Sequence, residues 1–332
     1  MNIVNPDRSD FISSAGMKTE VWQHDATRVL VVTASGAPPL DRQAERLREL
    51  VACRLHDYGA ILFRGFAKCG PTGFREFAAS FGHELLSYDF ASTPRRRIEG
   101  EVYSSTEYPN DQWIPQHNEQ AYMLRWPMKI WFYCDDAPRQ GGETPISDSR
   151  AIWSRLDPTL RKRFADRGLM YVRNYGGGLD LPWEKVFQTS DRKVVEEFCR
   201  TERIVCEWSD DGNLRTRQIC PALASHPVTN DILWFNQAHL FHVSALPEEL
   251  RETLLAVVAE PDLPRNVYYG DGGAIEGGAL AEIRGVYAEL LLRFTWQNGD
   301  VLMLDNMLTA HGRAPFDGPR RILVAMAEAH SQ

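Results

Sequence analysis

The chain has 332 residues, of which 43% are hydrophobic and 25% are charged. This composition is typical of a globular protein and excludes a disordered, collagen-like or coiled-coil chain. The formal net charge of -8 argues against a protein that works mainly by neutralising nucleic-acid phosphates or binding anionic lipid.

Targeting and redox signals both indicate a cytoplasmic protein. No stretch approaches the ~20 consecutive apolar residues of a membrane-spanning helix, and residues 1–13 contain no apolar signal-peptide core. The six cysteines show no C-x-x-C pair and no regular spacing, so we expect free thiols rather than a disulfide framework or a zinc site. The basic run Arg95-Arg96-Arg97 is typical of a solvated loop.

Apolar side chains at Leu40, Ala44, Leu47 and Val51 have helical spacing and predict an amphipathic helix over residues 39–57. Further helices are expected at residues 72–81, 149–164, 247–259 and 279–292. Between them, residues 99–118 are rich in polar residues and proline, which predicts a loop leading into a strand.

Short apolar runs predict the strands. They lie at residues 59–65, 129–134, 168–172, 204–208, 232–235, 301–304 and 322–326. Many short strands without a regular βαβ alternation favour a β-sandwich or barrel core over a doubly wound parallel sheet. We therefore expect one mainly β domain with helical decoration over residues 1–332, including a short N-terminal extension of about 25 residues.

The segment Gln116-His117-Asn118-Glu119 carries the strongest chemical signal. In an extended chain, side chains two positions apart lie on the same face, so His117 and Glu119 can reach one ion while Asn118 points away. The pair alone is a weak signal, because a surface histidine and glutamate need no metal.

His311 strengthens this interpretation, because it follows the predicted strand at residues 301–304. Two imidazoles and one carboxylate are the facial triad of non-haem Fe(II) oxygenases, whereas a closed zinc site would usually recruit cysteines. We therefore predict that His117, Glu119 and His311 bind the metal and form the catalytic centre. Asp305 and Asn306 are expected to shape the turn that presents His311.

Two further features suit a 2-oxoglutarate co-substrate. Gly141-Gly-Glu-Thr144 presents a hydroxyl from a tight glycine turn, and the pair Arg320-Arg321 follows His311. A guanidinium binds a carboxylate through two parallel charge-assisted hydrogen bonds. Strand alternation allows only one of the two arginines to face a pocket.

The ordered set of motifs resembles the taurine-dioxygenase-like (TauD/TfdA) superfamily of Fe(II)/2-oxoglutarate oxygenases, over roughly residues 40–328. Within it, several stretches resemble the branch typified by the syringomycin-biosynthesis aspartyl hydroxylase. They are Ser105-Thr-Glu-Tyr-Pro109, Gln116-His-Asn-Glu119, Arg173-Asn-Tyr-Gly176, Trp234-Phe-Asn-Gln-Ala-His-Leu-Phe-His242 and His311-Gly-Arg-Ala-Pro-Phe-Asp-Gly-Pro-Arg-Arg321.

The resemblance implies a double-stranded β-helix (jelly-roll) core, Fe(II) as the metal, and 2-oxoglutarate and O2 as co-substrates. It makes His117, Glu119 and His311 the iron ligands, and Thr144 and Arg321 the residues that contact 2-oxoglutarate. Glu119 stands where taurine dioxygenase has Asp, a variation shared with clavaminate-synthase-like members. Related halogenases lack this carboxylate, so its presence here favours hydroxylation.

The same branch implies an amino-acid substrate, free or tethered to a peptidyl carrier protein, in a nonribosomal peptide or antibiotic pathway. Two other classes remain open on the residues alone. One is a cupin-like metal-dependent hydrolase or isomerase, which would consume no 2-oxoglutarate. The other is a non-catalytic carrier-protein-binding module of the same fold, although an intact triad counts against it.

His239 and His242 are alternative ligands from an aromatic-rich segment. Histidines in such a segment more often pack in the core or beside a site than bind metal directly. We expect that role for both.

Overall fold

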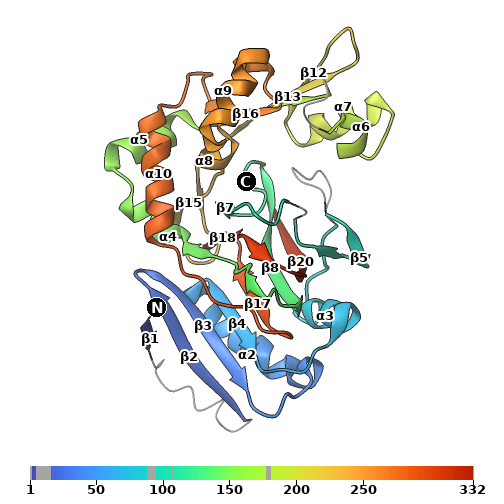
Figure 1. The fold of residues 1–332 in the computed structure, drawn as a ribbon, viewed down its shortest axis with the longest axis vertical. Helices are drawn as coiled ribbons and strands as arrows, with labels where there is room; N and C mark the ends of the chain where they lie inside the picture. The colour runs from blue at the N-terminus through green and yellow to red at the C-terminus, as the bar shows by residue number, and fades with distance from the viewer. Residues whose placement is uncertain (1, 5–15, 88–94, 107, 177–180, 332) are drawn as a thin grey trace.

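The computed structural model describes residues 2–4, 16–87, 95–106, 108–176 and 181–331. Within this part of the chain, the strands form a nine-stranded sheet, a three-stranded sheet, a four-stranded sheet and two two-stranded ribbons. Figure 1 shows the N-terminal strands at the lower end, and the four-stranded sheet with several helices at the upper end.

A hairpin followed by a βαβ unit forms the N-terminal edge of the nine-stranded sheet. Its elements are β1 (Asn2–Val4), β2 (Met17–His24), β3 (Thr27–Ala34), α2 (Leu40–Tyr58) and β4 (Ala60–Arg64), followed by α3 (Gly70–Ala79). Strand β3 runs antiparallel to β2 and parallel to β4. The predicted helix at 39–57 and strand at 59–65 are confirmed, and α2 buries Leu47 and Val51 in the core that it shares with the sheet.

Residues 17–24 belong to this sheet, although the sequence predicts only an extension for residues 1–25. β2 pairs with β3 along its whole length, and its Val21 and Trp22 side chains are buried. This segment is therefore an integral strand. The apolar run of β3, in which Val29 and Val31 are fully buried, is the sequence signal for the hairpin.

Three buried strands occupy the centre of the sheet, with two short strands beyond them. They are β17 (Val301–Asp305), β8 (Arg125–Asp136), β20 (Arg321–Ser331), β6 (Val102–Ser104) and β5 (Arg97–Glu99), in that spatial order. Along β20, Leu323 and Ala325 enter the core shared with α2, whereas Ile322 and Val324 enter a separate core on the other face. The two faces of β20 thus alternate residue by residue.

A three-stranded sheet packs against that second face. It consists of β10 (Ile146–Asp148), β18 (Thr309–Arg313) and β7 (Ile114–His117), with β18 in the centre. Ile146 shares a buried cluster with Ile322 and Val324, and the rings of His311 and Phe132 lie 4.9 Å apart across the sheets. Two packed sheets around a buried core agree with the predicted jelly roll.

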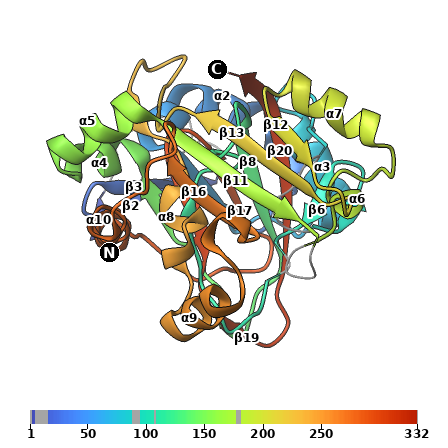
Figure 2. The ribbon, with the colours of Figure 1, turned by 90° about the horizontal axis from the view of Figure 1, so that it is seen from above.

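The remaining elements form a layer above these sheets. Its four-stranded sheet has the order β12 (Val205–Trp208), β13 (Leu214–Cys220), β11 (Leu169–Tyr175) and β16 (Arg265–Tyr269), and Figure 2 shows it lying across the jelly-roll strands. The helices are α4 (Ser149–Arg155), α5 (Pro158–Arg167), α6 (Trp183–Val186), α7 (Arg192–Thr201), α8 (Ala238–Phe241), α9 (Glu248–Val257) and α10 (Gly277–Glu289), with the 3-10 turns η1 (Val243–Ala245) and η2 (Glu260–Asp262). The two ribbons pair β14 (Leu223–Ser225) with β15 (Ile232–Trp234), and β9 (Gln140–Gly141) with β19 (Phe316–Asp317).

The single helix predicted over residues 149–164 is in fact two helices. Leu156 leaves the helical conformation after α4, and Asp157 begins α5 by accepting hydrogen bonds from the N–H groups of Thr159 and Leu160. Pro158 occupies the first turn of α5. Because proline has no N–H to donate, it suits the start of a helix and breaks its interior.

The state of the cysteines agrees with the sequence expectation. All six cysteines are free. No helix in the described ranges is long and apolar enough to cross a membrane.

Gly59 ends α2 and touches the strand that carries His311. Its φ is 72°, and a Cβ built there would lie 2.4 Å from Thr309 Oγ1. We predict that Gly59→Ala lowers the free energy of unfolding by about 2–5 kcal/mol, because alanine adds left-handed strain of ~1–2 kcal/mol and overpacking of ~1–3 kcal/mol.

Gly36→Ala is the matched control, because Gly36 also has a positive φ, 80°, but no atom of the described residues lies within 4 Å of its added Cβ. Gly36→Ala should lower the free energy of unfolding only by the cost of the left-handed strain. Urea denaturation of both variants measures the difference, and equal losses would contradict a packing role for Gly59.

Candidate metal centre

His117 and His311 lie side by side on neighbouring strands. They are direct partners in the register of β7 and β18, and their ring centroids are 4.8 Å apart. Residues directly opposite each other on antiparallel strands present their side chains on one face. The sheet therefore brings together two histidines that are far apart in the sequence.

Glu119 joins the two histidines from a turn rather than from the strand. β7 ends at His117, and Glu119 lies in the turn that follows. Its Oε2 is 3.7 Å from His311 Nε2, and one possible ligand atom from each of the three residues lies within 4.8 Å of the others. The structure thus brings the three predicted ligands together. Glu119 reaches the histidines from a turn, however, and not through the strand alternation that the sequence suggests.

The chemical state of the three side chains fits a divalent metal. His117 Nδ1 lies 2.8 Å from Pro115 O. Because a carbonyl oxygen can only accept, Nδ1 carries the proton and Nε2 keeps its lone pair. Burial lowers the pKa of His117 and lowers the pKa of His311 well below its usual value. Two neutral imidazoles and a carboxylate are a donor set that suits Fe(II).

Thr144, which is predicted to contact the co-substrate, lines a cavity beside the three residues. This cavity is lined by His117, His311, Thr144 and Arg320, among others, and encloses about 30 Å³. The buried Thr144 Oγ1 accepts a hydrogen bond of 3.2 Å from Trp296 Nε1.

The structure places Arg320, rather than the predicted Arg321, beside the cavity. The side chain of Arg321 is 47% exposed and forms an ion pair with Asp135 Oδ2 at 2.9 Å, outside the cavity. Arg320 lines the cavity instead. Its guanidinium donates hydrogen bonds to Gly142 O at 3.0 Å and to Ser105 Oγ at 3.3 Å. Arg320 is therefore the residue placed to meet a carboxylate in the cavity.

Arg320 directly precedes β20 and Arg321 is the first residue of that strand, and their side chains point to opposite sides. Arg320 lies on the same side as Val324, which also lines the cavity, whereas Arg321 follows the opposite side, where Leu323 packs. The structure therefore places Arg320, and not the predicted Arg321, at the cavity. Burial lowers the pKa of Arg320 to about 10, which still leaves the guanidinium protonated at neutral pH.

A second cavity residue, Arg95, also departs from the sequence prediction. The run of three arginines suggests a solvated loop, and Arg96 and Arg97 are exposed. Arg95, however, forms an ion pair with Glu119 Oε2 at 2.7 Å, and its side chain is only 3% exposed. Nothing in the sequence of the three arginines distinguishes Arg95 from Arg96 and Arg97. A metal at the trio would share the Glu119 carboxylate with this guanidinium.

His239 and His242 do not join the trio. His239 Nε2 donates to Gln116 O at 2.8 Å, its ring stacks on Tyr287, and burial lowers its pKa to about 3. His242 Nδ1 accepts a hydrogen bond from the backbone N–H of Ser244. Both histidines make the packing and capping contacts expected of residues beside a site.

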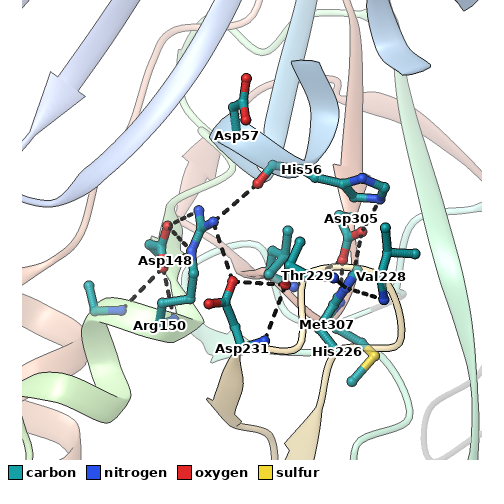
Figure 3. Close-up of polar contacts among 12 residues, drawn as sticks. His56, Asp57, Asp148, Arg150, His226, Val228, Thr229, Asp231, Asp305 and Met307 are labelled. Atoms are coloured by element: carbon teal, nitrogen blue, oxygen red, sulfur yellow. Dashed lines mark hydrogen bonds and ion pairs between the residues drawn. The ribbon is translucent and has the colours of Figure 1, made fainter. Parts of the chain in front are cut away.

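A second group that combines two histidines and a carboxylate is His56, His226 and Asp305 (Figure 3). His226 Nδ1 accepts hydrogen bonds from the backbone N–H groups of Val228 and Thr229. Its Nε2 therefore carries the proton and donates it to Asp305 Oδ2 at 3.1 Å. A protonated nitrogen cannot bind a metal, so the His226 ring anchors Asp305 instead.

Asp305 in turn shapes the chain before His311, as the sequence predicts. Its Oδ1 accepts hydrogen bonds of 3.0 Å from the N–H groups of Met307 and Leu308. The carboxylate thus holds the turn between β17 and β18.

A family model described as "Taurine catabolism dioxygenase TauD, TfdA family" matches residues 27–326, most of the chain. The chain belongs to this family. As a TauD/TfdA family member, the protein is a non-haem iron dioxygenase with 2-oxoglutarate and O2 as co-substrates, as the motifs predict. This membership favours the dioxygenase over the hydrolase and isomerase alternatives.

Two curated relatives support the assignment to the TauD/TfdA family. The chain is 40% identical over 274 residues to the dapdiamide synthesis protein DdaC of Enterobacter agglomerans, covering 82% of this chain and 83% of the relative. It is 32% identical over 284 residues to a clavaminate synthase-like protein of Arabidopsis thaliana, with the same coverage of 82% and 83%.

The fold is also similar to that of solved oxygenase structures. PvcB of Pseudomonas aeruginosa, described as an Fe, alpha-ketoglutarate dependent oxygenase from an isonitrile synthetic pathway, superposes with a TM-score of 0.57 at 18% identity. The match covers 98% of this chain and 94% of PvcB. This likeness confirms the predicted fold class.

Proposed function

We propose that this dioxygenase hydroxylates an unactivated carbon of an amino acid, free or tethered to a carrier protein, in the biosynthesis of a natural product. The single observation that carries the proposal is the cluster of two paired histidines and the buried Glu119 carboxylate, beside a cavity that Arg320 also lines. We also treat residues 1–332 as one catalytic domain, because the family match spans both packed sheets and the layer above them.

In this proposal His117, Glu119 and His311 hold the iron. Their donor atoms are clustered, and the two imidazoles are neutral. Bound iron, 2-oxoglutarate and O2 would supply the oxidising chemistry, while the chain supplies the metal ligands and orients the co-substrate. No side-chain nucleophile takes part.

Arg320 and Thr144 orient 2-oxoglutarate in the same proposal. Both line the cavity beside His117 and His311. The Arg320 guanidinium offers parallel N–H donors to the distal carboxylate, and the Thr144 hydroxyl can donate to a carboxylate oxygen while it accepts from Trp296. The buried position of Arg320 excludes water that would otherwise compete for its donors.

Two considerations support the substrate class and the reaction. DdaC, the relative at 40% identity, is named for the synthesis of dapdiamide, and the motifs resemble an amino-acid hydroxylase branch. If Glu119 binds the metal as proposed, its carboxylate would take the position that a halide needs, which favours hydroxylation over halogenation.

Mass spectrometry of a reconstituted reaction tests the proposal. The enzyme is loaded with Fe(II) without oxygen and then exposed to O2 and 2-oxoglutarate, with candidate amino acids offered free and bound to a carrier protein. We expect one candidate to gain one oxygen atom while 2-oxoglutarate is converted to succinate. Succinate formation coupled to a loss of two hydrogens from the substrate would contradict hydroxylation and indicate desaturation or ring closure.

A further inference from the structure

Asn306 makes direct contact with the backbone of Glu119 from a distant part of the chain. Its Oδ1 accepts the Glu119 N–H at 2.7 Å, and its Nδ2 donates to Glu119 O at 2.9 Å and to Pro127 O at 2.8 Å. The side chain is completely buried. One amide thus satisfies both polar groups of the Glu119 backbone.

The contact matters because Glu119 lies outside the paired strands, so strand pairing does not fix its position. His117 is the last residue of β7, and the chain turns directly after it, with Gln120 at a positive φ of 58°. Among the three proposed ligands, only the two histidines are fixed by direct pairing of β7 with β18. The position of the carboxylate relative to the histidines must therefore come from contacts outside the sheet.

The backbone that carries this side-chain amide is itself held by buried hydrogen bonds. Asn118 Nδ2 donates to Asn306 O at 2.6 Å and to Ser149 Oγ at 3.0 Å, and Gln237 Nε2 donates to Asn118 O at 2.7 Å. The turn that carries Asn306 is closed by Asp305, which the His226 ring anchors (Figure 3). These buried hydrogen bonds leave Asn306 little freedom to move.

We infer that Asn306 is a positioning residue, which fixes the Glu119 carboxylate at the distance and angle from His117 and His311 that the metal requires. Asn306 does not touch the metal. It acts through the Glu119 backbone. Its hydrogen bonds connect the turn after β7 to the turn before β18, and so hold Glu119 in a fixed position relative to the two histidines. This inference rests on the proposed metal centre.

Titration of the purified protein with Co(II), followed by visible absorption, tests the inference without catalysis. The Co(II) bands report both affinity and coordination geometry. Asn306→Ala should weaken Co(II) binding by about 10–100-fold, the usual cost of losing a residue that orients a ligand, and should change the shape of the bands. Asn306→Ser also removes the amide but keeps a small neutral polar side chain, so it should weaken Co(II) binding in the same direction, and it serves if the alanine variant fails to fold.

Asn266→Ala is the matched control. Asn266 is equally buried, accepts from Val243 N–H, and donates to Glu260 Oε1 and Tyr268 Oη, so its loss also removes a buried amide but touches no proposed ligand. It should lower thermal stability and leave the Co(II) affinity and bands unchanged. An Asn306→Ala protein that binds Co(II) like Asn266→Ala would overturn the inference.

The His311→Ala variant separates this outcome from failure of the proposed centre. If it binds Co(II) as wild type does, the metal lies elsewhere and both the proposed centre and the role of Asn306 are wrong. If His311→Ala loses Co(II) while Asn306→Ala keeps the wild-type affinity and bands, the proposed centre is supported and only the positioning role of Asn306 is wrong.

Discussion

Replacing His311 by alanine is expected to abolish 2-oxoglutarate-dependent turnover and to weaken metal binding by more than ~100-fold, since losing a residue that merely orients a ligand already costs ~10–100-fold. The protein should remain folded. His311 lies at the junction of the two sheets beside Phe132, and its imidazole has no hydrogen-bonding partner at Nδ1 among the residues that the structure describes. Its removal therefore breaks no hydrogen bond at that nitrogen, and the lost packing should cost about 1–3 kcal/mol.

Three measurements check this result: metal content after anaerobic Fe(II) loading, succinate formation, and thermal unfolding by circular dichroism. His56→Ala is the control, because His56 belongs to the second group of two histidines and a carboxylate. We expect the control to keep its iron and activity. Iron lost from His56→Ala but kept by His311→Ala would place the metal at that second group.

Replacing Arg320 by alanine should weaken 2-oxoglutarate binding by roughly 100-fold or more. Removing one partner of a desolvated charge pair typically costs ~3–5 kcal/mol, because the surviving charge is left without compensation, and each ~1.4 kcal/mol corresponds to a factor of ten. Arg320 qualifies as such a partner because it lines the cavity beside His117 and Thr144 and is largely buried.

Arg321→Ala is the control that the sequence itself supplies. Arg321 is half exposed and already paired with Asp135, and exposed ion pairs contribute only ~0–1 kcal/mol, so its loss should hardly change co-substrate binding. Arg320→Lys should recover part of the affinity, because lysine keeps the charge but not the planar fork. Anaerobic titration of each iron-loaded variant with 2-oxoglutarate gives the affinities, and a larger defect at Arg321 would contradict the side-chain directions in β20.

The sequence by itself determined the residue types of the proposed centre and the class of fold. His117, Glu119 and His311 could be selected because only a few side chains bind Fe(II) in this combination. The helix α2 and the strands β4 and β17 could be located because their patterns are local, with apolar residues at helical spacing or in short runs. Local patterns need no knowledge of what packs against them.

Only the tertiary structure decided which neighbouring residue faces the cavity. Arg320 and Arg321 differ by one position and have the same chemistry, so their roles depend on which side of β20 meets the three-stranded sheet. Arg95 is indistinguishable in sequence from Arg96 and Arg97, yet it alone reaches Glu119.

The same holds for Asn306 and for the group around Asp305. The hydrogen bonds from Asn306 to the Glu119 backbone, and from His226 to Asp305, join segments that lie far apart in the chain. Such contacts form only when the sheets bring those segments together, and no local periodicity encodes them. The sequence thus identified which atoms can hold the metal, whereas the folded chain determined how those atoms are held in place.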